Sequence, residues 1–118
     1  MKKILIIDDE KKIRNIYKRL LSLDGYIVIE APDASIGYDI LLKEKVDLVL
    51  LDINMPEVDG DIVTELIEAF HLKTKIIVAS VRPISEQKEM IKGALDYYDK
   101  SESLDLLYKK IEAHLGVV

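Results

Sequence analysis

The sequence has no cysteine, no long apolar run and no surplus of basic residues. Without cysteine, this chain of 118 residues can form neither a disulfide nor a thiolate metal site. No apolar stretch approaches the roughly 18 residues that a membrane-spanning helix needs. The net charge of −5 argues against sequence-independent binding of nucleic acid, which requires a basic surface. These absences predict a domain that contacts neither a membrane nor nucleic acid directly.

The sequence also lacks the signals of export and of ATP use. Its first ten residues, MKKILIIDDE, combine a basic start with a short apolar run, but acidic residues follow where a signal peptide has a longer apolar segment and a cleavage site. We therefore expect a soluble, cytoplasmic protein. No glycine-rich phosphate-binding loop is present, so we do not expect the chain to use ATP itself.

The residues that are present predict one α/β domain across residues 1–118. With 49% hydrophobic residues, the chain can bury a substantial core. Short apolar runs, typical of strands covered on both faces, alternate with segments whose apolar residues recur at helical spacing. Strands are expected at residues 3–7, 26–31, 46–51, 75–80 and 96–98, and helices at about 11–23, 33–44, 61–70, 85–92 and 103–115. This alternation predicts an open five-stranded parallel sheet with five helices on both faces.

Polar residues and glycine predict several helix ends. Asp33 and Ser85 each stand where a side-chain oxygen can accept a hydrogen bond from the first turn of a helix. Gly116 follows the last helix and is expected to stop it.

Side chains suited to chemistry follow several of the predicted strands. The stretch VDLVLLDINMPEVDG, residues 46–60, ends a buried-looking strand at a carboxylate. In open parallel sheets, functional groups gather at the carboxyl ends of the strands, near the switch in strand order. The groups that stand there are Asp8, Asp9, Asp52, Asn54, Ser80 and Lys100. We expect carboxylates, a hydroxyl and an ammonium to converge on one edge of the sheet.

These groups favour a hard metal ion and a phosphoryl group. Clustered carboxylates repel one another unless a cation is present. Oxygen ligands favour Mg²⁺, since the chain has no cysteine and its two histidines, His71 and His114, are isolated and expected at the surface. An aspartate can itself be the nucleophile, giving an aspartyl phosphate, while a lysine and a serine bind phosphoryl oxygens. The pattern therefore suits phosphoryl transfer onto an aspartate.

Each of these residues also has a simpler interpretation when it is considered alone. Asp8 and Asp9 can be a helix N-cap pair, and Asp52 can form a turn shortly before Met55 and Pro56. Ser80 and Lys100, taken singly, are more typical of an ordinary strand end and an ordinary surface position. The metal and phosphoryl interpretation depends on their occurring together.

Four pieces of the sequence stand in the order and spacing of a known family. ILIIDDE, LVLLDINMPEVDG, IIVAS and GALDYYDK together resemble the receiver domain of two-component response regulators, over essentially the full length of the chain. The resemblance implies a flavodoxin-like (βα)5 fold of the chemotaxis-receiver type, with strand order 2-1-3-4-5. It also implies a phosphoacceptor regulator rather than an enzyme.

The resemblance assigns the acceptor and the metal ligands. It implies that Asp52 is the phosphoacceptor and that Mg²⁺ is the cofactor. The carboxylates of Asp9 and Asp52 and the backbone carbonyl of Asn54 are the implied ligands, whereas Asp8 acts at the ion mostly through water.

The resemblance also assigns the phosphoryl-binding and switch residues. Ser80 and Lys100 are implied to bind phosphoryl oxygens. Tyr97, three residues before Lys100, matches the switch aromatic that rotates with Ser80, and Tyr98 does not match that spacing. The family usually has proline after the lysine, joined by a cis peptide bond, whereas this chain has Ser101. A non-proline cis bond costs roughly 3 kcal/mol, so either this bond is trans and the loop differs, or the fold holds a strained cis bond.

The implied function is that of a signalling module in a phosphorelay. Its partner is a sensor histidine kinase or a histidine phosphotransfer protein, whose phosphohistidine supplies the phosphoryl group, and slow self-dephosphorylation follows. We expect a monomer or weak dimer that acts on a downstream output protein. The expected docking face lies on the first helix, which carries Lys11, Lys12, Asn15, Ile16 and Arg19.

Two other functions match parts of the pattern. An aspartate-nucleophile phosphatase of the dehalogenase type needs a second aspartate two residues after the nucleophile, where this chain has Asn54. A receiver that serves only as a docking module has no need of the complete set of acidic, hydroxyl and ammonium groups. Both features favour the phosphoacceptor.

Overall fold

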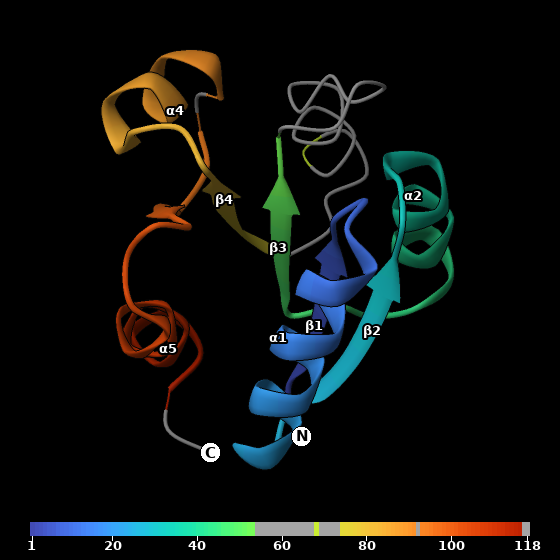
Figure 1. Cartoon of the computed structure of the whole chain (residues 1–118). Coiled ribbons are helices and arrows are strands. Elements are labelled where there is room, and N and C mark those ends of the chain that lie inside the picture. The colour runs from blue at the N-terminus through green and yellow to red at the C-terminus, as the bar shows by residue number, and fades with distance from the viewer. Residues whose placement is uncertain (54–67, 69–73, 92, 117–118) are drawn as a thin grey trace.

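The computed structural model describes residues 1–53, 68, 74–91 and 93–116, and the fold is given for these residues (Figure 1). The strands are β1 (Lys3–Ile7), β2 (Ile27–Ala31), β3 (Leu48–Asp52), β4 (Lys75–Ser80) and β5 (Asp96–Asp99). The helices are α1 (Lys11–Leu23), α2 (Ala34–Lys43), α4 (Ile84–Met90) and α5 (Leu104–Leu115). The predicted strands are confirmed with small shifts at their ends. The helix predicted at residues 61–70 lies outside the described residues, apart from residue 68.

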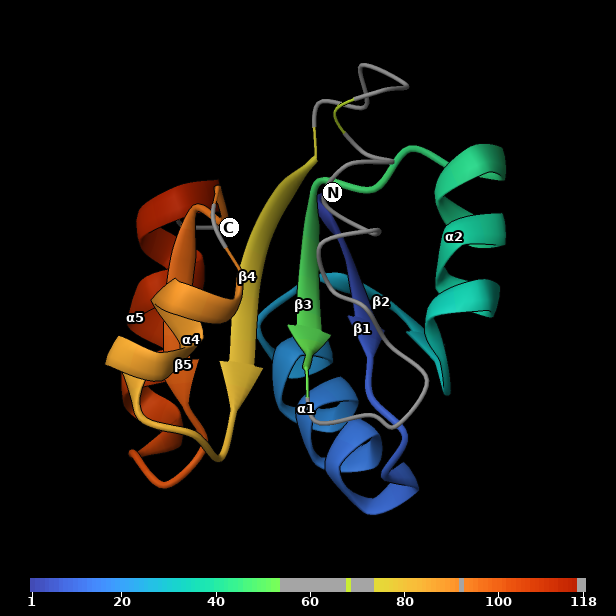
Figure 2. The ribbon, with the colours of Figure 1, turned by 90° about the horizontal axis from the view of Figure 1, so that it is seen from above.

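The five strands form one parallel sheet in the order β2-β1-β3-β4-β5, as the sequence predicted (Figure 2). Strand β1 therefore has β2 on one side and β3 on the other. From β1 the chain continues to β2 on one side, and from β3 it continues to β4 on the other side. The strand order therefore switches between β1 and β3. The residues that follow β1 and end β3 consequently face each other across the crevice that such a sheet opens.

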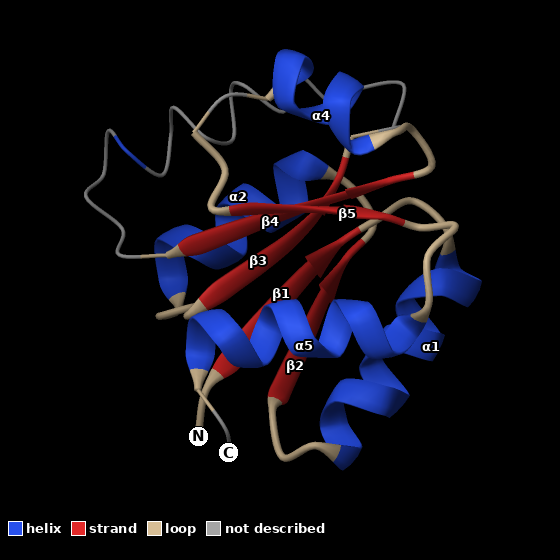
Figure 3. Cartoon of the chain, turned by 90° about the vertical axis from the view of Figure 1, so that its left-hand side faces the viewer, coloured by secondary structure: helices blue, strands red, loops and turns tan. Residues whose placement is uncertain are grey.

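Both faces of the sheet are covered, which explains why the runs Ile4–Ile7 of β1 and Leu48–Leu51 of β3 are apolar without interruption. One core cluster contains Leu5 and Ile7 together with residues of α2, and the other contains Ile4 and Ile6 together with residues of α1 and α5. Figure 3 shows α1 and α5 on one side of the sheet and α2 and α4 on the other. Adjacent residues of β1 thus alternate between two separate cores, so both must be apolar.

The helix ends follow the predicted capping residues in some places and not in others. Asp33 caps α2 by accepting the Ile36 N–H at 2.8 Å, and Gly116 ends α5 with φ of 83°. The prediction that Ser85 caps its helix is wrong, because α4 begins at Ile84 after the N-cap Pro83. The Pro83 carbonyl accepts the first N–H groups of this helix, and proline's fixed φ suits the chain's entry into the turn.

Gly37 allows α2 to lie close to the end of β1. A Cβ atom at this position would stand 2.5 Å from Cδ1 of Ile7, whose side chain is fully buried. A larger residue here would force the Ile7 side chain, or the helix and the strand, to move. This contact helps to fix the end of β1, which the acidic residues follow.

Candidate functional site

Four of the predicted site residues come together at the carboxyl edge of the sheet. Asp8 and Asp9 follow β1, Asp52 is the last residue of β3, and Lys100 follows β5. Carboxylate oxygens of the three aspartates lie within 4.8 Å of one another. Asp8 and Asp52 are only 2% and 3% exposed, whereas Asp9 is exposed. The expected convergence of carboxylates is therefore present.

Lys100 neutralises part of this acidic cluster. Its Nζ lies 2.8 Å from Asp8 Oδ2 and 3.3 Å from Asp52 Oδ2. Burial alone would lower the pKa of Lys100, but the hydrogen bond to Asp8 and the charge of Asp52 outweigh it and raise that pKa above its usual value. The ammonium therefore remains protonated at neutral pH and balances one of the two buried negative charges.

The acidic cluster fits a hard cation of the Mg²⁺ type. Its donors are carboxylate oxygens, it carries more negative charge than Lys100 balances, and Asp9 leaves one side open to solvent. The same charge acts beyond the site, since burial and then the nearby Tyr98, Asp8 and Asp52 raise the pKa of Tyr17. Asn54, the predicted backbone ligand, lies outside the described residues.

The alternative interpretation of Asp8 and Asp9 as a helix N-cap pair does not match the structure. The N-cap position of α1 is Glu10, and its side chain makes no capping hydrogen bond. Asp8 Oδ1 instead accepts the Glu10 N–H at 2.9 Å. Its other oxygen is bonded to Lys100, so each carboxylate oxygen of Asp8 already accepts one hydrogen bond.

Ser80 stands beside the acidic cluster at the end of β4. It is fully buried, its Oγ accepts the Arg82 N–H at 3.0 Å, and its carbonyl accepts the Lys100 N–H at 2.8 Å. The hydroxyl hydrogen is not used in accepting the bond from Arg82, so it is available to an oxygen atom in the crevice. A backbone hydrogen bond thus joins Lys100 to Ser80.

The two adjacent tyrosines of β5 have different environments. Tyr98 is 1% exposed, and its hydroxyl donates to the carbonyls of Glu102 and Ser103 at 2.7 and 3.1 Å. Tyr97 is partly buried against the first core cluster, and its hydroxyl donates to the Ile91 carbonyl at 2.5 Å. Tyr98 is therefore a fixed core residue, while Tyr97 lies at the boundary between core and solvent.

The peptide bond between Lys100 and Ser101 is trans, since none of the described peptide bonds is cis. Asp99 organises the turn after β5 instead, because its Oδ1 accepts both the N–H and the hydroxyl of Ser101. These two hydrogen bonds lower the pKa of the Asp99 carboxyl. Of the two geometries that the sequence left open, the structure has the trans bond.

Gln87 is a buried residue of the site that the sequence did not reveal. This side chain of α4 is fully buried, and its Nε2 donates to the carbonyls of Arg82 and Tyr98 at 2.7 and 3.0 Å, with the Ser80 carbonyl at 3.5 Å. Its Oε1 has no hydrogen-bond partner within the described residues. Gln87 therefore ties α4 to the backbone on which Ser80 stands. Only its polarity at a core position of a short helix could have drawn attention to it.

The histidines give no metal site in the described part of the chain. The sequence suggested that His114 is isolated, but its Nε2 lies 3.0 Å from Asp96 Oδ2. Lys110 contacts the same carboxylate at 3.1 Å, at the opposite end of β5 from Lys100. His71 lies outside the described residues. The pair of Asp96 and His114 is a structural contact between β5 and α5.

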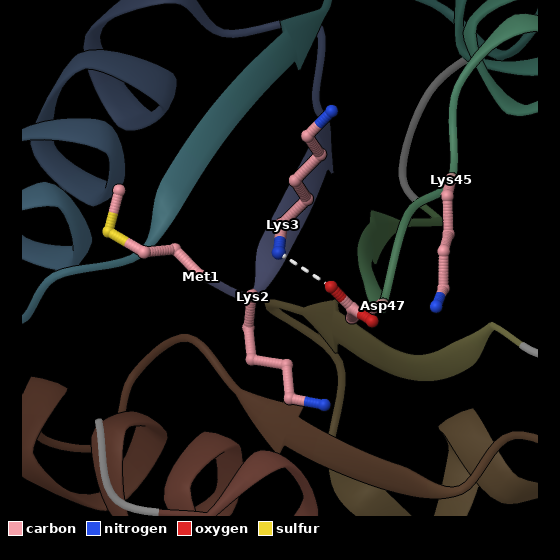
Figure 4. Close-up of a pocket in the computed structure, with 5 residues that line it drawn as sticks. All are labelled: Met1, Lys2, Lys3, Lys45 and Asp47. Carbon is pink, nitrogen blue, oxygen red and sulfur yellow. Dashed lines mark hydrogen bonds between the residues drawn. The ribbon is translucent and has the colours of Figure 1, made fainter.

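A hollow of about 380 Å³ lies at the opposite, amino-terminal edge of the sheet (Figure 4). Lys2, Lys3, Lys45 and Asp47 line it together with Met1. The carboxylate of Asp47 accepts the Lys3 N–H at 2.8 Å, and the Asp47 N–H donates to the Lys3 carbonyl at 2.9 Å. The Asp47 carboxylate thus joins the start of β1 to the segment before β3, a structural role.

None of the helices in the described part of the chain combines the length and the apolar composition needed to cross a bilayer.

The sequence matches the model of the response regulator receiver domain family over residues 4–112. It is 35% identical over 117 residues to the transcriptional regulatory protein YxdJ of Bacillus subtilis, a match that covers 98% of this chain and 51% of that protein. It is 30% identical over 117 residues to sporulation initiation phosphotransferase F of the same organism, covering 96% of this chain and 93% of that protein. The chain therefore spans about half the length of the first relative and nearly all of the second.

Solved structures show the same fold. The response regulator TrrA of Thermotoga maritima, in complex with Mg²⁺-BeF, has a TM-score of 0.87 at 31% identity and covers 98% of this chain and 100% of its own. The chemotaxis protein CheY4 of Vibrio cholerae has a TM-score of 0.89 at 26% identity and covers 98% of this chain and 99% of its own. The flavodoxin-like fold predicted from the sequence is confirmed.

Proposed function

The chain belongs to the receiver domain family of two-component response regulators, and we propose that Asp52 is the side chain on which it accepts a phosphoryl group. The observation that carries this proposal is the meeting of Asp52 with Asp8, Asp9 and Lys100 at the switch point of the sheet. Asp52 ends a fully buried strand, so its carboxylate has a fixed position. A fixed carboxylate beside a protonated lysine is suited to attack an activated phosphorus atom.

The transfer step follows from these groups. A carboxylate oxygen of Asp52 attacks the phosphorus of a phosphohistidine on the partner. The bond between phosphorus and the imidazole nitrogen breaks, and that nitrogen leaves with the electron pair and takes up a proton. The Lys100 ammonium and the Ser80 hydroxyl donate hydrogen bonds to the phosphoryl oxygens. Slow attack of water on the aspartyl phosphate then returns the domain to its starting state.

Mg²⁺ is the metal that this site is proposed to bind. Asp9 and Asp52 would hold it with the backbone carbonyl of Asn54, and Asp8, whose oxygens accept hydrogen bonds from Lys100 and the Glu10 N–H, would act mostly through water. The bound ion supplies positive charge for the phosphoryl oxygens during transfer. The TrrA structure, which holds Mg²⁺-BeF, supports this assignment for a receiver of similar fold.

We propose that Ser80 and Tyr97 form the output switch. The Ser80 hydroxyl turns toward the phosphoryl group, and Tyr97 then leaves its contact with the Ile91 carbonyl and moves inward. Because this hydrogen bond has to break, phosphorylation must favour the inward state by a few kcal/mol. The result is a changed surface next to α4 and β5 for a downstream protein.

The proposed docking face for the phosphohistidine partner is the exposed side of α1. Lys11, Lys12, Asn15 and Arg19 are exposed, and Ile16 is 45% exposed. Exposure of Ile16 rules out a core role for this apolar residue, so its side chain is available to a partner. We further propose that residues 1–118 act as one receiver domain, because all described strands share one sheet.

The test of the acceptor is labelling by a small acyl phosphate with Mg²⁺. We expect one phosphoryl group on the wild type and none on Asp52→Asn. Asp39→Asn, which changes an exposed aspartate of α2, is the matched control and should label normally. Labelling of Asp52→Asn at the wild-type level would show that another residue is the acceptor.

A further inference from the structure

The backbone of Asp8 is held by two other elements of the fold. Its N–H donates to the Ala31 carbonyl at the end of β2, at 3.1 Å. Its carbonyl accepts a hydrogen bond of 2.6 Å from Nη1 of Arg14, a residue of α1. The Arg14 side chain is only 13% exposed, and its Nε lies 3.3 Å from Oε1 of Glu30 in β2. One guanidinium therefore joins α1, β2 and the segment that carries the acidic cluster.

This contact fixes the backbone that leads into Asp9. The peptide unit between Asp8 and Asp9 is planar, so a fixed Asp8 carbonyl oxygen also fixes the nitrogen and Cα of Asp9. Asp9 is exposed, and its carboxylate must remain within reach of the Asp52 oxygens for the two to share an ion. Arg14 thus acts on the orientation of a proposed metal ligand without contacting the metal.

We propose that Arg14, oriented by Glu30, is a positioning residue that holds the Asp8–Asp9 peptide in the geometry for Mg²⁺ binding. The inference rests on the proposed Mg²⁺ site. The positioning role and the charge of Arg14 predict opposite changes in Mg²⁺ affinity when Arg14 is replaced. A cation near the site repels Mg²⁺, so on charge alone the loss of Arg14 would tighten Mg²⁺ binding. On the positioning role its loss weakens binding.

Lys18 provides a matched control. Its Nζ lies 3.4 Å from the other carboxylate oxygen of Glu30, and its side chain is 53% exposed. Arg14→Met and Lys18→Met therefore remove the same charge from the same carboxylate. Only the first of them also removes the hydrogen bond to the Asp8 carbonyl.

The experiment is a calorimetric titration of each full chain with MgCl₂. We expect Arg14→Met to raise the Kd for Mg²⁺ about tenfold, as the loss of an outer partner of a metal ligand commonly does. Lys18→Met should stay within about twofold of the wild type, because its exposed charge is screened by solvent and salt. Arg14→Lys keeps the charge but lacks the two-sided fork, so it should also weaken binding. Equal affinities for Arg14→Met and Lys18→Met, or tighter binding by Arg14→Met, would overturn the proposal.

Three further measurements separate the possible failures. If circular dichroism shows that Arg14→Met is unfolded, Arg14→Lys decides the question, and wild-type affinity in that variant refutes the positioning role. If the wild type binds Mg²⁺ no better than Asp9→Ala, the proposed metal site is wrong. The metal-free amide NMR spectrum still tests Arg14 in that case. The Asp9 amide should shift in Arg14→Met and not in Lys18→Met, and an unchanged Asp9 amide in both contradicts the inference.

Discussion

Replacing Lys100 with methionine should destabilise the metal-free protein by about 3 kcal/mol. The substitution keeps the length of the side chain and removes a cation that lies 2.8 and 3.3 Å from two buried carboxylates. Removing one partner of a buried ion pair typically costs about 3–5 kcal/mol, because the remaining charge is uncompensated. We take the lower end, since exposed Asp9 gives water and cations access to the cluster. For a domain of this size the melting temperature should fall by about 10 °C.

Mg²⁺ should restore part of this loss. Lys100 and Mg²⁺ compete for the oxygens of Asp52, so the variant should bind the ion more tightly than the wild type. With a Kd of about 1 mM, 10 mM Mg²⁺ stabilises the wild type by about 1.4 kcal/mol. If the affinity of the variant is about tenfold higher, the same concentration stabilises it by about 2.7 kcal/mol. The difference between the two proteins then narrows by about 1.3 kcal/mol.

Urea denaturation followed by circular dichroism, in EDTA and in 10 mM Mg²⁺ (about ten times the expected Kd), measures both quantities. Lys110→Met is the control, because Lys110 contacts Asp96 at 3.1 Å, far along β5 from the acidic cluster. Its pair is partly exposed, so its loss should cost about 1 kcal/mol or less and should not depend on Mg²⁺. Wild-type stability of Lys100→Met in EDTA, or the same Mg²⁺ response in both variants, would refute the reasoning.

Three further predictions concern pH, docking and the switch. Burial raises the pKa of Asp96, but hydrogen bonds led by that from His114 outweigh it and the pKa is lowered. The contribution of Asp96 to stability is therefore present above its unfolded pKa of about 3.9 and is lost as pH falls through the folded pKa. In urea denaturation, the wild type and Asp96→Asn should therefore differ in stability at neutral pH and become equally stable in acid. A difference that persists in acid contradicts this. Lys12→Glu should slow phosphotransfer from the partner while leaving labelling by a small acyl phosphate unchanged, and Lys43→Glu on α2 should affect neither; the docking face is wrong if both variants transfer alike. NMR of the Tyr97 ring with beryllofluoride and Mg²⁺ should show a new rotamer, and an unchanged ring would refute the switch but not the acceptor.

The sequence by itself determined the strands and most of the site. Apolar runs such as Leu48–Leu51 have no polar face, so they are stable only when helices cover both sides of a sheet. Because parallel strands end at one edge, the residues after these runs had to meet there, and Asp8, Asp9, Asp52 and Lys100 do. Local chemistry likewise gave the Asp33 cap and the Gly116 stop. The strand order came from the resemblance to a family rather than from any local pattern.

Tertiary structure alone decided where α4 begins and which long-range partners the polar side chains find. Ser85 was a plausible cap by its residue type, but the helix starts earlier, where the chain after Pro83 turns. The contacts of Arg14 with Glu30 and of His114 with Asp96 join residues 16 and 18 positions apart through different elements. Gln87 likewise binds carbonyls of the β4–α4 connection and of β5. In an extended chain, a polar side chain has several possible hydrogen-bond partners of similar energy. Only the packing of helices on the sheet brings one of these partners within hydrogen-bonding distance and excludes the water that would otherwise compete for the bond.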